Sequence, residues 1–86
     1  MSDAEVLGGR MVYAFIMVET VSGQSESVRE AVEGFDDVRE AHVVAGRFDV
    51  VVEVDAAEVY DVLHAASTSI QGTEGVSDTT TYVALD

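Results

Sequence analysis

The spacing of hydrophobic positions divides the chain into segments with strand or helix periodicity. Residues 11–19 (MVYAFIMVE) form a β-rich run that is apolar on both alternating faces, as in a buried strand. Residues 38–45 and 48–54 are two further runs rich in β-branched side chains, and residues 76–85 alternate threonine with apolar residues. These four segments predict four β-strands.

Two stretches follow helical spacing instead. The first predicted helix has Ser22 or Ser25 as its N-cap and ends at Gly34. The second follows Asp55, interpreted as a cap with Glu58 three residues on. The apolar positions of the two helices are Val28, Ala31, Val32 and Phe35 in the first, and Val59, Val62, Leu63, Ala66 and Ile70 in the second. The order strand, helix, strand, strand, helix, strand predicts an α+β, ferredoxin-like fold, with two helices on one face of a four-stranded antiparallel sheet.

Gly46 and Arg47 separate the two middle strands and predict a two-residue hairpin turn with glycine first. The resulting register pairs Val43 with Val50, Ala41 with Val52, and Arg39 with Val54, on a face that must lie under the helices. The opposite face carries His42 opposite Val51, Glu40 opposite Glu53, and either Tyr13, Phe15 and Met17 or Val12, Ala14, Ile16 and Val18. Either set leaves large apolar side chains uncovered, which predicts a homodimer formed through this open sheet face.

Composition sets limits on the class of protein. The chain has 86 residues, of which 48% are hydrophobic, and contains neither cysteine nor proline. We expect a flexible tail at residues 1–10, with Met11 as an alternative natural start, and one domain at residues 11–86. The lack of cysteine excludes disulfides and thiolate metal sites. No apolar run approaches the roughly 18 residues of a membrane span, so no membrane partner is expected and the expected location is the cytoplasm.

The charge balance is strongly acidic, with 17 acidic residues against four arginines, no lysine, and a formal net charge of −13. Nucleic-acid binding depends on basic side chains that neutralise phosphates, so direct DNA contact is not expected. An acidic, lysine-free chain is favoured in a cytosol of high salt, where screening weakens self-repulsion. The composition therefore indicates a halophilic source, with an acidic partner-binding module of a non-halophile as the alternative.

Several motifs resemble the effector-binding RAM domain of the Lrp/AsnC transcription regulators. They are the opening strand VYAFIMVE, the hairpin VAGRFD at residues 44–49, and Gly75-Val76 followed by TTTYV at residues 79–83. The resemblance implies a sheet-to-sheet homodimer, assembly into rings of dimers, and small effectors, usually amino acids, bound between subunits. It also implies, as the effector-binding residues, Gly46, Asp49, Thr79 and Thr81.

The chain departs from the full regulators in one respect. Those carry an N-terminal helix-turn-helix, whereas only ten residues precede the first predicted strand here. The chain therefore resembles the stand-alone form of the domain. Any effect on transcription would pass through a DNA-binding chain, such as an Lrp/AsnC-type paralogue.

The chemistry of an amino-acid site fits these residues. Asp49 can bind the ligand's ammonium, backbone N–H groups near Gly46 can bind its carboxylate, and the hydroxyls of Thr79 and Thr81 can donate or accept. Each residue also has a purely structural interpretation. Asp49 is then a turn-stabilising acid, Gly46 serves the turn alone, and the two threonines are ordinary strand residues.

Two other functions share this topology. A small dimeric α/β-barrel enzyme, such as an isomerase or monooxygenase, would use His42 with Asp49 or Glu53 for proton transfer. An ACT-type regulatory module would use a glycine after the first strand, for which Gly23 is the candidate. His42 is more simply an interface residue and His64 a partly buried one, and two histidines on different elements argue against a metal site. We therefore predict a non-enzymatic effector-binding and oligomerisation module with no cofactor.

Overall fold

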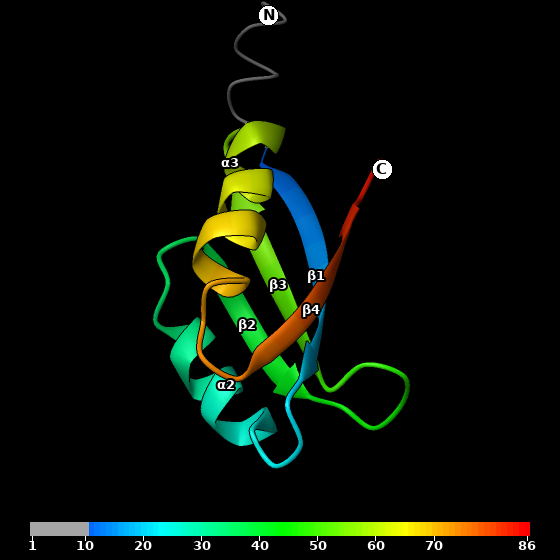
Figure 1. Ribbon diagram of the computed structural model, residues 1–86. Coiled ribbons are helices and arrows are strands. Elements are labelled where there is room, and N and C mark those ends of the chain that lie inside the picture. The colour runs from blue at the N-terminus through cyan, green and yellow to red at the C-terminus, as the bar shows by residue number, and fades with distance from the viewer. Residues whose placement is uncertain (1–10) are drawn as a thin grey trace, which may run out of the picture.

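The computed structural model describes residues 11–86, except for the side chain of Ser67. The elements in chain order are β1 (Val12–Thr20), α2 (Ser25–Glu33), β2 (Val38–Val43), β3 (Val50–Ala56), α3 (Val59–His64), the π-helical segment η1 (Ala65–Ile70) and β4 (Val76–Val83). The strands form one antiparallel sheet in the order β2-β3-β1-β4, and both helices lie on one face of it (Figure 1). The predicted ferredoxin-like fold is confirmed. The expected flexible tail, residues 1–10, lies outside the described residues.

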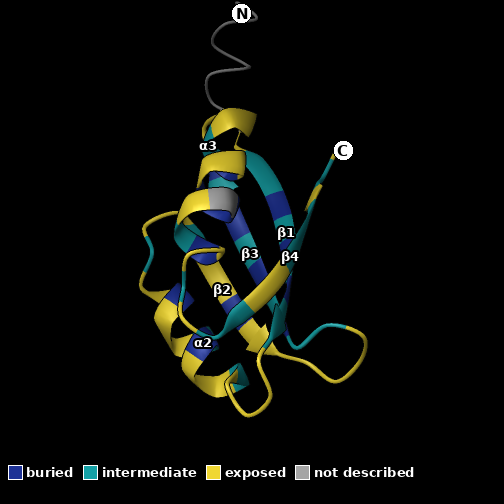
Figure 2. Ribbon diagram, viewed as in Figure 1, coloured by how far each residue is buried: buried dark blue, intermediate teal, exposed yellow. Residues whose placement is uncertain are grey.

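The core lies between the two central strands and the helices, as the dark blue segments of Figure 2 show. Strand residues that alternate with more exposed ones supply one side of it: Ala14, Ile16, Val18, Ala41, Val50, Val52, Val54 and Ala56. The helical side consists of Val28, Val32, Val62, Ala65, Ala66 and Ile70. This period of two in the strands fixes which side chains face the helices. Within residues 11–86, no helix is long and apolar enough to cross a membrane.

The burial of Ala14, Ile16 and Val18 settles the orientation of β1, which the sequence left undecided. Their neighbours Tyr13, Phe15 and Met17 lie on the open face, away from the helices. The rings of Tyr13 and Phe15 lie 5.0 Å apart in an edge-to-face arrangement. The open face is therefore aromatic along β1.

The strand pairing of β2 and β3 is confirmed in part. Val43 pairs with Val50 and Ala41 with Val52, as predicted, but Val54 pairs with Val38 rather than Arg39. A bulge between Val38 and Glu40 leaves Arg39 as an extra residue. The prediction that Arg39 faces the helices is wrong: its guanidinium lies 5.6 Å from the ring centre of Tyr13 and 3.8 Å from Asp55, both on the open face.

The predicted two-residue turn at Gly46 and Arg47 is wrong. β2 ends at Val43 and β3 begins at Val50, so a longer loop connects them, and it extends beyond the end of the sheet (Figure 1). The backbone N–H of Val44 donates to the carbonyl of Asp49 at 2.9 Å, which closes this loop. A turn with glycine first requires a positive φ at that glycine, and Gly46 does not have one.

The predicted helix caps are also wrong. Gln24 is the N-cap of α2 and Glu58 is the N-cap of α3, and neither side chain makes a capping hydrogen bond. Ser25 is already helical, with its hydroxyl 3.1 Å from that of Thr20, and Asp55 lies inside β3. Tertiary pairing extended β3 beyond the residue that local preference selected as a cap. Gly34 ends α2 as predicted.

The second helix buries a narrower stripe than its spacing predicts. Val62, Ala66 and Ile70 are buried, but Val59 and Leu63 are 47% and 50% exposed. The helix widens into η1, where the N–H of Gln71 bonds to the carbonyl of Ala66 at 3.0 Å, five residues back. Ala65 and Ala66 face the core, whereas Val59 and Leu63, at the edges of the predicted apolar stripe, remain at the surface.

Candidate functional site

Two of the four predicted effector residues, Asp49 and Thr79, lie beside the end of β1. Gly46 and Asp49 belong to the loop between β2 and β3, and the N–H of Asp49 donates to the carbonyl of Val18 at 2.9 Å. Thr79 pairs with Val18 from the other side, through β4. Val18 thus lies between Asp49 and Thr79. Thr81 is two residues farther along β4, opposite Ile16.

The Asp49 carboxylate takes part in the sheet. Its Oδ2 accepts a hydrogen bond from the backbone N–H of Thr20 at 2.8 Å, where the pairing of β1 with β3 has ended. This bond satisfies a half-buried donor at the end of a strand. A carboxylate has several acceptor positions, so the bond leaves capacity for a ligand's ammonium group. Asp49 therefore has a structural role at the end of β1, and its remaining acceptor positions also permit it to bind a ligand.

Thr79 and Thr81 lie on the helix side of β4, because their partners Val18 and Ile16 both face the core. β4 is an edge strand, and both threonines are half-buried. Gly46 is exposed and Asp49 half-buried. Asp49, Thr79 and Thr81 thus border one corner of the sheet, and Gly46 lies three residues before Asp49 in the exposed loop.

This corner is acidic. Asp49 directly precedes β3 on one side of β1, and on the other side Glu19 pairs with Asp78 on the open face, opposite to the face of Thr79. Like charges directly opposite each other on adjacent strands repel. Arg47 lies in the same loop, with its guanidinium 5.4 Å from the ring centre of Phe48. Asp49 is therefore the carboxylate of this corner that is placed to attract a positively charged ligand group.

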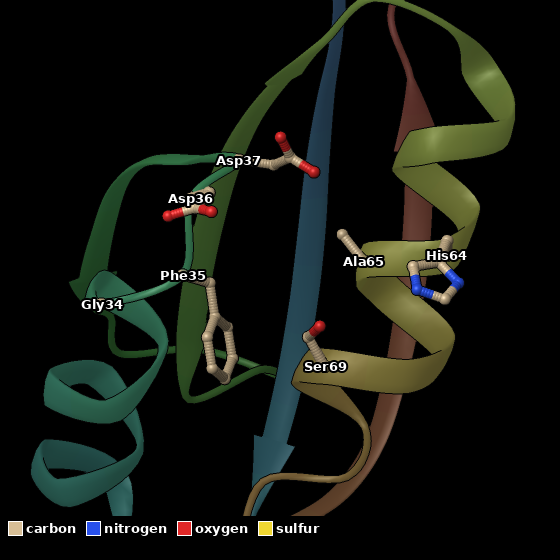
Figure 3. Close-up of a pocket in the computed structure, with 7 residues that line it drawn as sticks. All are labelled: Gly34, Phe35, Asp36, Asp37, His64, Ala65 and Ser69. Carbon is tan, nitrogen blue, oxygen red and sulfur yellow. The ribbon is translucent and has the colours of Figure 1, made fainter.

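Two cavities of the described residues lie away from this corner. One of about 360 Å³ separates the α2–β2 loop from the second helix and is lined by Gly34, Phe35, Asp36, Asp37, His64, Ala65 and Ser69 (Figure 3). Another, of about 320 Å³, lies between residues 11–13, Ala57, Val59 and residues 83–86. Neither cavity is lined by any of the four predicted effector residues. His64 is exposed and stacks on Tyr60 at 6.4 Å, so the expectation of a partly buried histidine is wrong.

A second group of functional side chains lies on the open face. His42 Nε2 lies 2.9 Å from Glu40 Oε1, and Glu53 is close to both. Sequence reasoning considered Asp49 or Glu53 as the acid beside His42 and missed Glu40. The signal was present, because the predicted register already placed Glu40 opposite Glu53 on the face of His42.

Tyr13 connects this group to the aromatic side chains of β1. Its hydroxyl donates to Glu53 Oε1. This hydrogen bond, followed by desolvation and the negative charge of Glu53, raises the pKa of Tyr13 above its ordinary value of 10.0. Tyr13 therefore remains a neutral donor that orients the Glu53 carboxylate.

Comparison with known proteins identifies the family. The model of the Lrp/AsnC ligand-binding domain matches residues 13–86, which is nearly the whole described domain. The chain belongs to the Lrp/AsnC ligand-binding domain family. Its resemblance to the RAM domain, based on the hairpin and the final strand, is thereby confirmed.

Proteins similar in sequence to this chain include a leucine-responsive regulatory protein. The leucine-responsive regulatory protein of Haemophilus influenzae is 28% identical over 61 residues, which cover 71% of this chain and 37% of that protein. The chain thus spans little more than a third of the length of that curated relative. Hypothetical protein PHS023 from Pyrococcus horikoshii is 31% identical with a TM-score of 0.80, over 87% of this chain and 90% of that one.

The fold also matches a larger regulator with a bound amino acid. A transcriptional regulator from Neisseria meningitidis, solved in complex with L-Met, superimposes with a TM-score of 0.78 at 18% identity. The match covers all of this chain and 56% of that one. At this identity the likeness establishes a shared fold.

Proposed function

We propose that this domain binds a small effector, an amino acid, and couples binding to self-assembly in the control of transcription. The observation that carries the proposal is the family match over residues 13–86, because the matching family is a ligand-binding domain of transcription regulators. The L-Met complex of the Neisseria regulator supports an amino acid as the ligand class. In this role the domain is non-enzymatic and acts in the cytoplasm, where its target genes are.

The proposed binding site is the corner formed by Gly46, Asp49, Thr79 and Thr81. The ligand's ammonium group binds the Asp49 carboxylate, and its carboxylate meets backbone N–H groups near Gly46, where no side chain blocks the approach. The two threonine hydroxyls complete the polar contacts. Because the corner is open to solvent, a neighbouring subunit supplies the wall that excludes water and holds the ligand's side chain.

The proposed assembly uses the open sheet face. Large apolar side chains occupy the part of it on β1, β3 and β4: Tyr13, Phe15, Met17, Val51 and Tyr82. Tyr82 is 56% exposed. A second copy packed sheet to sheet covers this surface, and dimers then join into a ring. A ligand that binds between subunits favours the assembled state by mass action, which couples effector concentration to assembly.

The output of such a sensor reaches DNA indirectly. A chain with a formal net charge of −13 gains nothing from phosphate neutralisation. In the proposed mechanism the effector changes the assembly of this domain with a DNA-binding chain of the same family. Co-purification with such a chain, in the presence and absence of effector, measures this step.

A thermal-shift screen of the twenty amino acids tests the effector. At least one should raise the melting temperature of the wild-type chain, and Asp49→Asn should abolish that shift. Asp49→Asn retains an acceptor for Thr20 and removes the charge, so the fold is preserved. Asp37→Asn, which neutralises an exposed acid away from the corner, is the matched control and should keep the shift.

Two outcomes would contradict the proposal. If no amino acid shifts the wild-type transition, the ligand class is wrong. If the shift survives in Asp49→Asn, the site lies elsewhere. Turnover of a small substrate that disappears in His42→Ala would instead establish the enzymatic alternative.

A further inference from the structure

Three potential metal ligands converge on the open sheet face. The side chains of Glu40, His42 and Glu53 each offer one ligand atom, and these atoms all lie within 4.8 Å of one another. His42 Nε2 and Glu40 Oε1 are 2.9 Å apart. In the single chain the side chains of His42 and Glu40 are 58% and 48% exposed, and they lie on the sheet face that is proposed to pack against a second copy.

The backbone holds these residues together. Glu40 and Glu53 are direct cross-strand partners, and His42 follows Glu40 by two residues on the same face of β2. Residues 40–43 pair with residues 50–53 in one continuous register, and the bulge between Val38 and Glu40 lies beyond the cluster. The three ligands therefore come from two adjacent, paired strands rather than from mobile loops.

Among residues 11–86, no arginine forms a salt bridge with Glu40 or Glu53. Two carboxylates directly opposite each other on neighbouring strands repel. Arg39 is the nearby base, but its guanidinium lies 3.8 Å from Asp55 and 5.6 Å from the Tyr13 ring centre. A bound cation between Glu40 and Glu53 would relieve their repulsion.

The Glu53 carboxylate is oriented by a hydrogen bond from outside the cluster. The Tyr13 hydroxyl donates to Glu53 Oε1 from the adjacent strand β1. Such hydrogen bonds to a ligating carboxylate are typical of the groups that surround metal sites, where they fix the orientation of the ligand. Tyr13 would thus be a positioning residue.

We propose that Glu40, His42 and Glu53 bind one divalent transition-metal ion, with Zn²⁺ as the representative. An imidazole nitrogen and two carboxylate oxygens suit Zn²⁺ and its neighbours better than Mg²⁺ or Ca²⁺, which prefer oxygen ligands alone. Bonds of about 2.0–2.2 Å require ligand atoms roughly 3–3.5 Å apart, and small rotations of the exposed Glu40 and His42 side chains would close the remaining distance to the half-buried Glu53. Three protein ligands leave a coordination position for water or for a group of another subunit.

Isothermal titration of the full chain with Zn²⁺ tests the site. The wild-type chain should bind one ion per chain, and His42→Ala should abolish saturable binding at that site. His64→Ala removes the other histidine of the chain, which lies on α3, and should bind as tightly as the wild type. Tyr13→Phe should weaken binding roughly 10- to 100-fold, as expected for loss of a group that orients a ligand.

Several results would overturn the proposal. They are the absence of saturable Zn²⁺ binding, equal affinity in His42→Ala and His64→Ala, and equally tight binding of Mg²⁺, which would indicate non-specific attraction to acidic residues. Circular dichroism establishes that each variant is folded, and His42→Gln replaces His42→Ala if the latter unfolds. Zn²⁺ should also raise the melting temperature of the wild type but not that of the His42 variant. All three ligands belong to one chain and lie outside the proposed effector corner, so this outcome is independent of the amino-acid screen.

Discussion

Asp49 Oδ2 lies 2.8 Å from the backbone nitrogen of Thr20, so a side chain completes the hydrogen bonding of β1 where strand pairing ends. The bond joins two residues that are 29 positions apart in the chain. It gives Asp49 a structural role that is separable from ligand binding. Experiments on this residue must therefore distinguish the two roles.

Asp49→Ala should lower the free energy of unfolding by about 1–3 kcal/mol, because it leaves the half-buried Thr20 N–H without an acceptor. Asp49→Asn keeps a side-chain oxygen for this bond and should stay close to wild type. Urea denaturation of both variants measures the difference. Equal stability of Asp49→Ala and the wild type would show that water replaces the carboxylate at no cost.

Gly46 and Gly75 should respond differently to substitution by alanine. Gly75 has a φ of +96°, and an added Cβ would lie 2.9 Å from Val28 Cγ2, whereas at Gly46 φ is not positive and nothing lies within 4 Å. Gly75→Ala should therefore cost about 1–3 kcal/mol, and Gly46→Ala should leave stability nearly unchanged. Thermal denaturation checks both. A matching loss in Gly46→Ala would mean that the loop is more constrained than its geometry indicates.

The stability of the fold should depend on Tyr13 at alkaline pH. The pKa of this phenol is raised in the folded state, chiefly by its hydrogen bond to Glu53, and it has its ordinary value near 10 in the unfolded chain. As the pH rises above about 10, the unfolded chain loses this proton first, so it binds fewer protons than the folded chain. The stabilisation is thus complete below that pH and is lost as the pH rises through the folded pKa.

Tyr13→Phe should flatten this alkaline loss of stability relative to the wild type. Tyr60→Phe, which alters a ring that is 72% exposed, is the matched control and should keep the wild-type profile. Urea denaturation on both sides of pH ~10 measures the effect. Parallel profiles for all three proteins would contradict a role for the Tyr13 hydrogen bond.

Phe15→Glu should disrupt the proposed assembly. Phe15 lies on the open face between Glu53 and Tyr82, so a carboxylate there would be buried without a partner in a sheet-to-sheet dimer. Light scattering should show a fall in mass from the wild-type oligomer to the monomer. Leu63→Glu places the same charge on the helical layer, at a side chain 50% exposed, and should leave the mass unchanged. A wild-type chain that is itself monomeric at high concentration would refute the dimer.

The fold followed from sequence because its evidence is local. Strand and helix periodicities are set by backbone geometry, so the order of elements and the buried valines of β3 could be predicted without coordinates. The predictions that failed concern residues where two elements meet. The Arg39 bulge and the inclusion of Asp55 in β3 depend on pairing partners, and neither residue differs locally from an ordinary strand or cap residue.

For the candidate sites, too, the sequence identified residues but not the contacts between them. The motif residues Gly46, Asp49 and Thr79 could be named from sequence, but the bond from Thr20 to Asp49 could not, because it depends on where the β1–β3 pairing stops. Likewise, each ligand of the open-face cluster could be read from the chain. The pairing of Glu40 with Glu53 could also be predicted from the hairpin, but the approach of the three ligand atoms to within 4.8 Å depends on side-chain conformations that the sequence does not give.

Sequence alone thus determined the elements, their order, the acidity of the chain and the apolar character of β1, since each follows from composition or from spacing along a single segment. The tertiary structure decided which face of β1 lies under the helices and which carboxylate Tyr13 holds. The reason is that these outcomes depend on contacts between segments far apart in the chain, where a shift of one residue in register moves every side chain to the opposite face.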